Sequence, residues 1–187
     1  MGDEGRIVRA ADLRPRPWPN GLGTTRDVAE ATGPDGRPDW LLSVADLERD
    51  APFSHLPGLD RVFTLIEGDT IDLAVDDAPP LACRLLLPTH FPGDRPTTSR
   101  LTGGPGRAFN VFVDRSTRRT RVASLNLAAG ATVLSEGDVA IVYAVEGTLA
   151  IGPARLGPGD TWIGRVGASV GADGPATLIL AAIDPRG

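Results

Sequence analysis

The residues best suited to chemistry lie in a short segment near the amino terminus. Residues 14–27 carry three prolines at alternate positions, followed by an Asn20-Gly21 turn and by Arg26. The prolines favour an extended chain, and the glycines allow a tight turn and a close approach of the backbone. Such a segment can place amides, hydroxyls and a guanidinium around one point, as a site for an anion or carboxylate requires. An ordinary hairpin turn with Trp18 as a hydrophobic plug is the alternative.

A second arginine, Arg61, stands at the start of the apolar run Val62 to Gly68. Two interpretations are open for this side chain. It can pair with Asp60 or Asp94 at the rim of a barrel. Alternatively, its guanidinium points into the mouth of the barrel, where it can bind both oxygens of a carboxylate.

The supply of histidine argues against a metal site. The chain has only two, His55 and His90, which are far apart in the sequence. A transition-metal site needs two or three imidazoles that converge on one point. A site built from carboxylates alone, Glu67, Asp69 and Asp72, is disfavoured because strand alternation divides these side chains between two faces. We therefore expect neither a metal nor another cofactor.

Composition excludes further classes of function. The 19 basic residues are all arginines, and the net charge is −5, which argues against general binding of nucleic acids or anionic membranes. No apolar run reaches transmembrane length, and no signal segment begins the sequence, so we expect a cytoplasmic protein. The single cysteine, Cys83, lies in an apolar strand and is predicted to be a core residue.

A repeat indicates the elements that position these residues. Residues 62–68 and 141–147 are both apolar runs that end in Glu-Gly, and Pro-Gly-Asp follows each of them, at 92–94 and at 158–160. A strand, a glycine turn, a return strand and a second turn form one unit, which is used twice. We predict an all-β protein with one lobe in residues 1–121 and a second in residues 122–187, or one compact domain with strand exchange between the lobes.

Other segments are less regular. Residues 39–46 fit the periods of both a strand and a short helix poorly, so the sequence leaves their structure open. Residues 178–183 are continuously apolar, which predicts a strand that is buried on both faces.

Five blocks in the same order resemble the HutD/Ves family of the cupin superfamily. The match covers about residues 13–113, with a looser cupin-like tail through Trp162. The blocks are Trp18-x-Asn20-Gly21-x-Gly23-Thr24-Thr25-Arg26-Asp27, then Asp39-Trp40-x-x-Ser43-Val44-Ala45, then Pro52-Phe53-Ser54-x-x-Pro57-Gly58-x-Asp60-Arg61 with Leu65-x-Glu67-Gly68, then Phe91-x-Gly93-Asp94, and finally Phe109-Asn110-Val111.

The resemblance implies a two-lobed cupin fold, that is, a bicupin of two jelly rolls (double-stranded β-helices), without a metal. In bacteria it also implies a link to histidine utilisation, with formylglutamate or urocanate as the ligand. This sequence departs from the family pattern at Leu22, Leu41 and Ala108, where a glycine, an arginine and an acid are usual. Carried over to this chain, the ligand site has polar residues and aromatic walls, namely Asn20, Thr25, Arg26, Ser43, Arg61 and Asn110 with Trp18, Trp40 and Phe109.

We therefore expect a small-molecule-binding protein that holds a small carboxylate and modulates histidine utilisation as a sensor or a metabolite buffer. The alternative is a metal-free cupin enzyme, an isomerase or hydrolase that uses His55 or His90. A protein-interaction module that uses exposed strand edges is a third class. Open edges are also compatible with a homodimer. We expect no nucleic-acid or membrane partner.

Overall fold

The structure is a computed structural model, and it describes residues 5–18 and 21–187. Across these residues the chain forms nineteen β-strands and one 3-10 helix, η1 (Ala10–Asp12). The predicted all-β class is therefore confirmed. None of the helices in the described part of the chain is long and apolar enough to cross a membrane.

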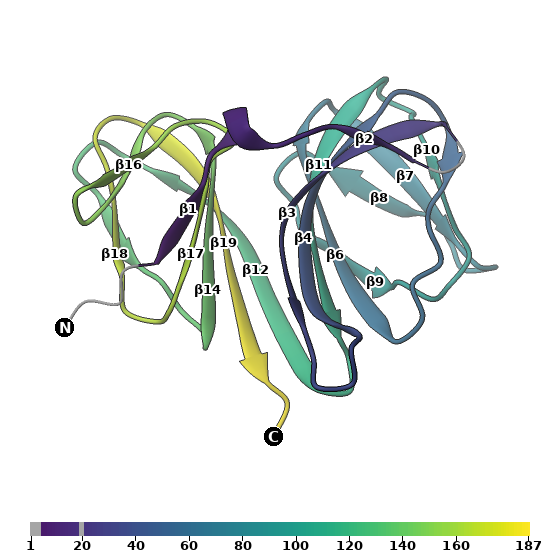
Figure 1. The fold of residues 1–187 in the computed structure, drawn as a ribbon. Helices are drawn as coiled ribbons and strands as arrows, with labels where there is room; N and C mark the ends of the chain where they lie inside the picture. Colours follow the sequence, from purple (N-terminus) through teal and green to yellow (C-terminus); the bar gives the residue numbers. More distant parts are fainter. Residues whose placement is uncertain (1–4, 19–20) are drawn as a thin grey trace. The chain divides into compact units, whose positions relative to one another are not determined.

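The chain divides into two compact units, which we call the first and the second barrel (Figure 1). The first barrel is Arg14–Arg118, and the second combines Met1–Leu13 with Arg119–Gly187. Residues 5–13 belong with the second barrel, because β1 (Arg6–Val8) pairs antiparallel with β17 (Thr161–Gly164).

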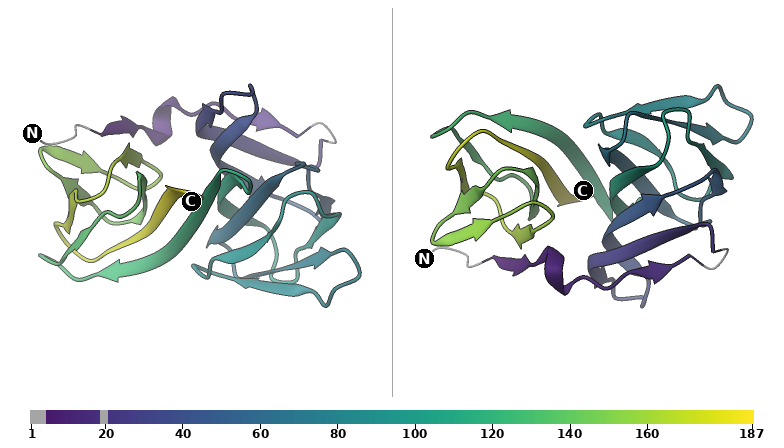
Figure 2. Two further views of the ribbon diagram at one scale, coloured as in Figure 1. Left: turned by 90° about the horizontal axis from the view of Figure 1, so that it is seen from below. Right: turned by 90° about the horizontal axis from the view of Figure 1, so that it is seen from above.

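The first barrel consists of two sheets that curl around one interior (Figure 2). The six-stranded sheet has the order β2-β3-β4-β11-β6-β9, and the four-stranded sheet has the order β5-β10-β7-β8. The bounds are β2 Arg16–Pro17, β3 Gly23–Thr32, β4 Pro38–Leu47, β5 Ala51–Pro52, β6 Leu59–Glu67, β7 Thr70–Val75, β8 Leu81–Arg84, β9 Thr89–Pro92, β10 Thr97–Arg100 and β11 Gly106–Asp114.

The interior of the first barrel contains the inward side chains of both sheets. Cys83 is fully buried there, which confirms its predicted core position, and burial raises the pKa of its thiol. The segment left open by the sequence forms β4, a strand buried on both faces, which is why no single period is visible in it. The core contains Ala45, Leu47, Phe63, Leu65, Ile71, Leu73, Val75, Cys83, Phe91 and Ala108.

The second barrel repeats this plan with a five-stranded sheet, β1-β17-β14-β19-β12, and a four-stranded sheet, β13-β18-β15-β16. Its hydrophobic core includes Trp162. The remaining bounds are β12 Arg118–Leu127, β13 Thr132–Leu134, β14 Val139–Glu146, β15 Leu149–Ile151, β16 Ala154–Leu156, β18 Ser169–Ala172 and β19 Ala176–Pro185.

The sequence repeat is also a structural repeat, since both central ladders contain a bulge at the same step. In the pairing of β6 with β11, the partners pass from Glu67 to Leu65 and skip Ile66. In the pairing of β14 with β19, they pass from Glu146 to Ala144 and skip Val145. Each bulge therefore stands directly before a Glu-Gly turn.

Glycine is required at both of these turns. Gly68 has φ 105° and Gly147 has φ 77°, a region that side chains rarely adopt. A Cβ atom would lie 2.9 Å from the carbonyl oxygen of Pro105 at the first turn and 2.5 Å from that of Pro175 at the second. The two Glu-Gly pairs thus end equivalent strands in the same way.

Candidate functional site

A cavity of about 130 Å³ opens into the first barrel. It lies over the inner face of the six-stranded sheet, and residues of the loop after β5 complete it. The lining combines charged, hydroxyl and aromatic side chains, namely Arg16, Trp18, Thr25, Asp27, Leu41, Ser43, Ala45, Phe53, Ser54, Leu56, Arg61, Asn110 and Phe112.

The register of the sheet explains why distant residues meet here. Asp27, Ser43 and Asn110 are direct partners across β3, β4 and β11 and therefore share one face. In the next row of the same face, Phe112 stands between Leu41 on β4 and Arg61 on β6. These two rows form the floor of the cavity.

Arg61 is the central charged group of the cavity. Its side chain is on the inner face of the sheet and only 6% of the residue is exposed. Nε and Nη2 donate hydrogen bonds to Oδ1 of Asn110, at 3.0 and 2.8 Å. Nδ2 of Asn110 donates in turn to the carbonyl oxygen of Ala108 at 3.3 Å, so the amide is held in the orientation that presents its oxygen to Arg61.

Arg61 has no acidic partner among the described residues. The two aspartates considered as partners from the sequence, Asp60 and Asp94, contact Arg115 instead, at 3.1 and 3.0 Å. Of the two interpretations, the guanidinium that points into the barrel is therefore the one observed. Its five N–H donors, minus the two that reach Asn110, leave three for a ligand.

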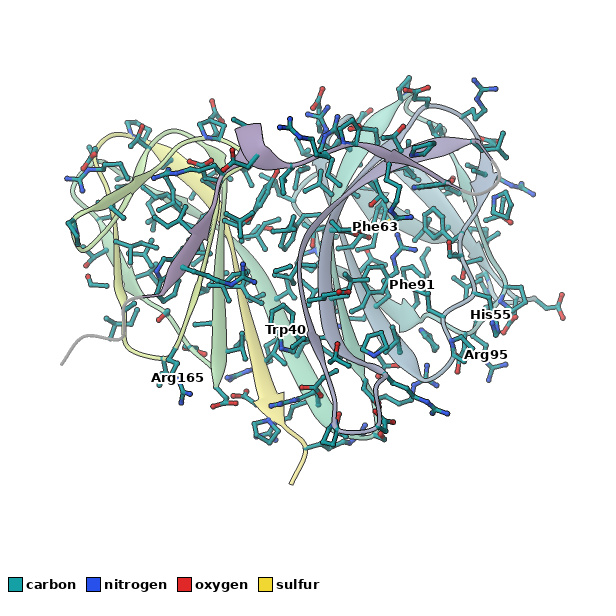
Figure 3. All side chains as sticks on the ribbon, in the orientation of Figure 1. Trp40, His55, Phe63, Phe91, Arg95 and Arg165 are labelled. Atoms are coloured by element: carbon teal, nitrogen blue, oxygen red, sulfur yellow. The ribbon has the colours of Figure 1, made fainter. Side chains whose placement is uncertain are left out.

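Aromatic rings surround the Arg61 guanidinium. Its central carbon lies 4.1 Å from the ring centroid of Phe53, 5.0 Å from that of Phe112, 5.5 Å from that of Phe91 and 5.6 Å from that of Phe63. Figure 3 shows Phe63 and Phe91 inside the first barrel. The rings attract the cation, but they do not replace water or a counter-ion. Burial consequently lowers the pKa of Arg61 to about 9.

The hydroxyl groups of Thr25, Ser43 and Ser54 and an ion pair complete the polar lining. Oγ1 of Thr25 donates to the carbonyl oxygen of Val44 at 3.3 Å. Ser43 is buried, and its hydroxyl forms no hydrogen bond with any described residue. The more exposed part of the lining carries Arg16 and Asp27, which are bound to each other.

The structure brings together five of the predicted ligand-site residues, Trp18, Thr25, Ser43, Arg61 and Asn110. Asn20 lies outside the described residues.

Arg26 is not part of the cavity lining. It lies on the other face of β3, where Nη1 contacts Oδ2 of Asp46 at 2.5 Å. Arg107 contacts the other oxygen of Asp46. Burial opposes the ionisation of Asp46, but the hydrogen bonds from the two arginines outweigh it and lower its pKa. The charge of Arg26 is thus balanced by an aspartate away from the cavity.

The predicted walls require a correction. Trp18 lines the cavity, but Trp40 and Phe109 lie on the opposite face of the six-stranded sheet, as Figure 3 shows for Trp40 relative to Phe63 and Phe91. The aromatic walls are instead Phe53 and Phe112. Phe112 could have been found from the sequence, because it stands two residues after Asn110 on one strand.

Of the three residues that depart from the family pattern, Leu22, Leu41 and Ala108, only Leu41 is in the cavity lining. Leu41 lines the cavity, so an arginine at this position would add a cation to it. Ala108 is buried in the core of the first barrel, and Leu22 is half-buried. The cavity of this chain therefore differs in charge from one that follows the family pattern at position 41.

Neither histidine belongs to the cavity. His55 and His90 are exposed and are absent from its lining, and Figure 3 shows His55 at the periphery of the first barrel. Within residues 5–18 and 21–187, no group of three or more His, Cys, Asp or Glu side chains is placed to hold a metal ion. The chemistry of the lining is that of binding through a cation, hydroxyls and aromatic surface.

Comparison with known sequences gives a family and relatives. A family model described as HutD matches residues 10–179. A Pseudomonas putida protein, described as an uncharacterized 21.2 kDa protein in the hutC 3' region, is 35% identical over 122 residues, which are 63% of this chain and 62% of the relative. The match thus spans less than two thirds of that relative. Protein Ves of Cronobacter sakazakii is 30% identical over 144 residues, 75% of this chain and 76% of the relative.

Solved structures agree with this result. A conserved protein of unknown function from Pseudomonas aeruginosa PAO1, PA5104, superposes with a TM-score of 0.86 at 26% identity, covering 97% of this chain and 99% of the other. HutD from Pseudomonas fluorescens SBW25, in a formate condition, gives 0.81 at 28% identity, covering 98% and 100%. Bacterial pirin YhhW from Escherichia coli, in complex with nickel(II), gives 0.70 at 8% identity, covering 98% and 100%, a likeness of fold alone. The chain has the two-lobed cupin fold.

Proposed function

This chain belongs to the HutD family, and on that premise we propose that its first barrel binds a small carboxylate and that the protein modulates histidine utilisation as a sensor or buffer of that metabolite. One observation carries the proposal. Arg61 is a buried guanidinium without an acidic partner among the described residues, and it borders a cavity.

The energetics of burial favour an anion at this position. A charge removed from water is unfavourable unless a counter-charge or several hydrogen bonds compensate it. Asn110 supplies one acceptor atom, which satisfies part of the Arg61 guanidinium. A carboxylate can accept two parallel charge-assisted hydrogen bonds from the remaining N–H groups. The hydroxyl of Ser43 is available as a further donor on the same floor.

The size of the cavity supports a small ligand. Its volume of about 130 Å³ is similar to that of engineered protein cavities of about 150 Å³ that hold one benzene molecule. Urocanate and formylglutamate both carry a carboxylate on a short chain, and a part of either molecule could extend through the mouth. The carboxylate would lie at Arg61, with the aromatic rings of Phe53 and Phe112 beside the rest of the molecule.

The relatives support the connection to histidine utilisation. The Pseudomonas putida relative is described by its position 3' of hutC, and the Pseudomonas fluorescens neighbour is named HutD. The enzyme alternative draws no support from the cavity, since neither His55 nor His90 lines it. A binding role uses the cation, a hydroxyl and the aromatic rings of the lining.

Isothermal titration calorimetry with urocanate, formylglutamate and glutamate at pH 7.5 tests the proposal. We expect Arg61→Gln to weaken binding by about 10- to 100-fold, as expected for the loss of hydrogen bonds to a charged group. Arg26→Gln is the matched control, because it removes the same charge from the same sheet outside the cavity. We expect its affinity to stay within about 2-fold of the wild type. Absence of binding by all three ligands, or an equal loss in both variants, contradicts the proposal.

A further inference from the structure

An ion pair at the cavity has no part in the function proposed so far. Nη2 of Arg16 donates to Oδ1 and Oδ2 of Asp27, at 3.1 and 2.8 Å, and Nε donates to Oδ2 at 3.2 Å. The side chains are 58% and 47% exposed, and surface pairs of this kind add little to stability. Both residues nevertheless line the same cavity as Arg61.

The strand register gives the separation of Asn110 and Asp27 across the sheet. Asn110, which holds Arg61, pairs with Ser43, and Ser43 pairs with Asp27, so two strand spacings separate Asn110 from Asp27. Two spacings of about 4.8 Å amount to about 10 Å. Ser43 lies midway between them. Arg61 lies on the next strand, β6, in the neighbouring row, so a ligand that reaches both Arg61 and Asp27 extends along the floor of the cavity.

The charges at the two ends differ in kind. Arg61 presents a cation without an acidic partner among the described residues, whereas Arg16 and Asp27 neutralise each other. A second carboxylate on the ligand would come to lie beside the carboxylate of Asp27, and like charges repel. An N–H group would meet an acceptor instead. Asp27 offers about four lone-pair sites, of which Arg16 occupies three, so one is open.

We propose that Asp27, oriented by Arg16, is a second recognition point, which selects monocarboxylates that carry an N–H donor at their far end and disfavours dicarboxylates. The inference rests on the proposed function, because it places the carboxylate of the ligand at Arg61. It narrows the substrate class to a short acid with one negative charge and an N–H donor, for example in an imidazole ring. Arg16 acts as a positioning residue, since it holds the carboxylate of Asp27 through three hydrogen bonds.

Three probes of similar length distinguish these chemistries by calorimetry at pH 8. The first is 3-(imidazol-4-yl)propanoate, the second is its furan analogue, which lacks the N–H, and the third is the dicarboxylate glutarate. For the wild type we expect the imidazole acid to bind about 10-fold more tightly than either of the others, as expected for one charge-assisted hydrogen bond.

The variant Asp27→Asn keeps the shape of the side chain and removes its charge. We expect the preference for the imidazole acid over its furan analogue to fall to about 2- to 3-fold, and glutarate to bind about 5- to 10-fold more tightly than to the wild type, because Arg16 is released and the repulsion is gone. Asp35→Asn is the matched control. It removes the same charge from another exposed aspartate–arginine pair of the first barrel, outside the cavity lining. We expect its affinities to match the wild type.

The outcomes separate the two proposals. A wild type that prefers glutarate, or an Asp27→Asn variant that keeps the wild-type affinity ratios among the three acids, overturns the selection by Asp27 while carboxylate binding at Arg61 stands. If none of the three acids binds to the wild type, both proposals fail. Asp27→Asn is also compared with the wild type by thermal unfolding, and an unchanged melting temperature together with the reduced preference supports the role in recognition.

Discussion

The two barrels contain the same bulged ladder but place different side chains on it. Six residues before the Glu-Gly turn, the first barrel has Arg61 and the second has Ala140. Two residues beyond the bulge on the facing strand, the first barrel has Asn110 and the second has Leu180. One interior therefore contains a hydrogen-bonded cation beside a cavity, and the other contains only apolar side chains at the equivalent positions.

The second barrel fills its interior with a large side chain. Trp162 is buried in its core, close against the backbone of Gly5 and Gly164, where a Cβ atom would lie 2.3 Å from the ring. The comparison teaches that the cupin plan alone does not create a binding site. A few inward-facing positions decide whether a barrel is packed throughout or contains a polar cavity.

The Pro-Gly-Asp segments also differ between the barrels. In the second barrel, Gly159 has φ 85° within a tight turn, and the carboxylate of Asp160 accepts hydrogen bonds from Arg9 and from the N–H of Ala10. Asp160 thereby fastens the amino-terminal segment to its barrel. In the first barrel, Asp94 contacts Arg115 at 3.0 Å. The same three residues thus anchor different parts of the chain.

The largest effect is expected when the charged group of the first barrel is introduced into the second. Ala140→Arg places a guanidinium in a packed apolar core that has no acceptor prepared for it. We expect the free energy of unfolding to fall by about 3–5 kcal/mol, from the buried charge and from overpacking. Urea unfolding measures this change. Ala123→Arg, at an exposed position of β12, is the control, and an equal effect of the two substitutions would refute the contrast.

The reverse exchange gives the first barrel the apolar character of the second. Arg61→Met combined with Asn110→Leu removes the cation together with its acceptor, so neither is left unsatisfied. We expect the free energy of unfolding to rise by about 1–3 kcal/mol, because replacing buried charged groups by apolar ones of similar volume is often stabilising. Binding of carboxylates should be lost. A decrease in stability in urea would mean that the contacts of Arg61 with its four rings stabilise the fold.

A smaller, pH-dependent effect distinguishes the two Pro-Gly-Asp anchors. Burial opposes the ionisation of Asp160, but hydrogen bonds from Ala10, Arg9 and Gly157 outweigh it and lower its pKa below 3.8. A lowered pKa stabilises the folded protein above the unfolded value of about 3.8, and this contribution disappears as pH falls through the folded value. We expect Asp160→Asn to lower the free energy of unfolding by about 1–2 kcal/mol at pH 7.

Urea unfolding at pH 7 and at pH 3 checks this prediction. The difference between the wild type and Asp160→Asn should become smaller at pH 3, and a difference that does not change with pH would count against it. Asp94→Asn is the comparison, with a smaller loss at pH 7, because Asp94 is held mainly by the side chain of Arg115.

Part of the site could be read directly from alternation along the strands. Asn110 and Phe112 are two residues apart on β11, and Thr25 and Asp27 are two apart on β3, so each pair shares a face. The same rule places Arg26 and Thr25 on opposite faces of β3, and Phe109 and Asn110 on opposite faces of β11. Strand alternation therefore argues against a site that contains both Thr25 and Arg26, or both Phe109 and Asn110. The structure places Arg26 and Phe109 outside the cavity lining.

The sequence by itself determined the all-β class, the repeated Glu-Gly turns and the absence of enough histidine for an imidazole metal site, because these depend on residue types and short spacings. Only the tertiary structure decided which face of each strand looks into a barrel. It also decided that Arg115 forms ion pairs with Asp60 and Asp94, and that β1 pairs with a strand of the second barrel. These features depend on pairing between segments that are far apart in the sequence. Alternation places adjacent residues of a strand on opposite faces, but it does not determine which face points into the barrel.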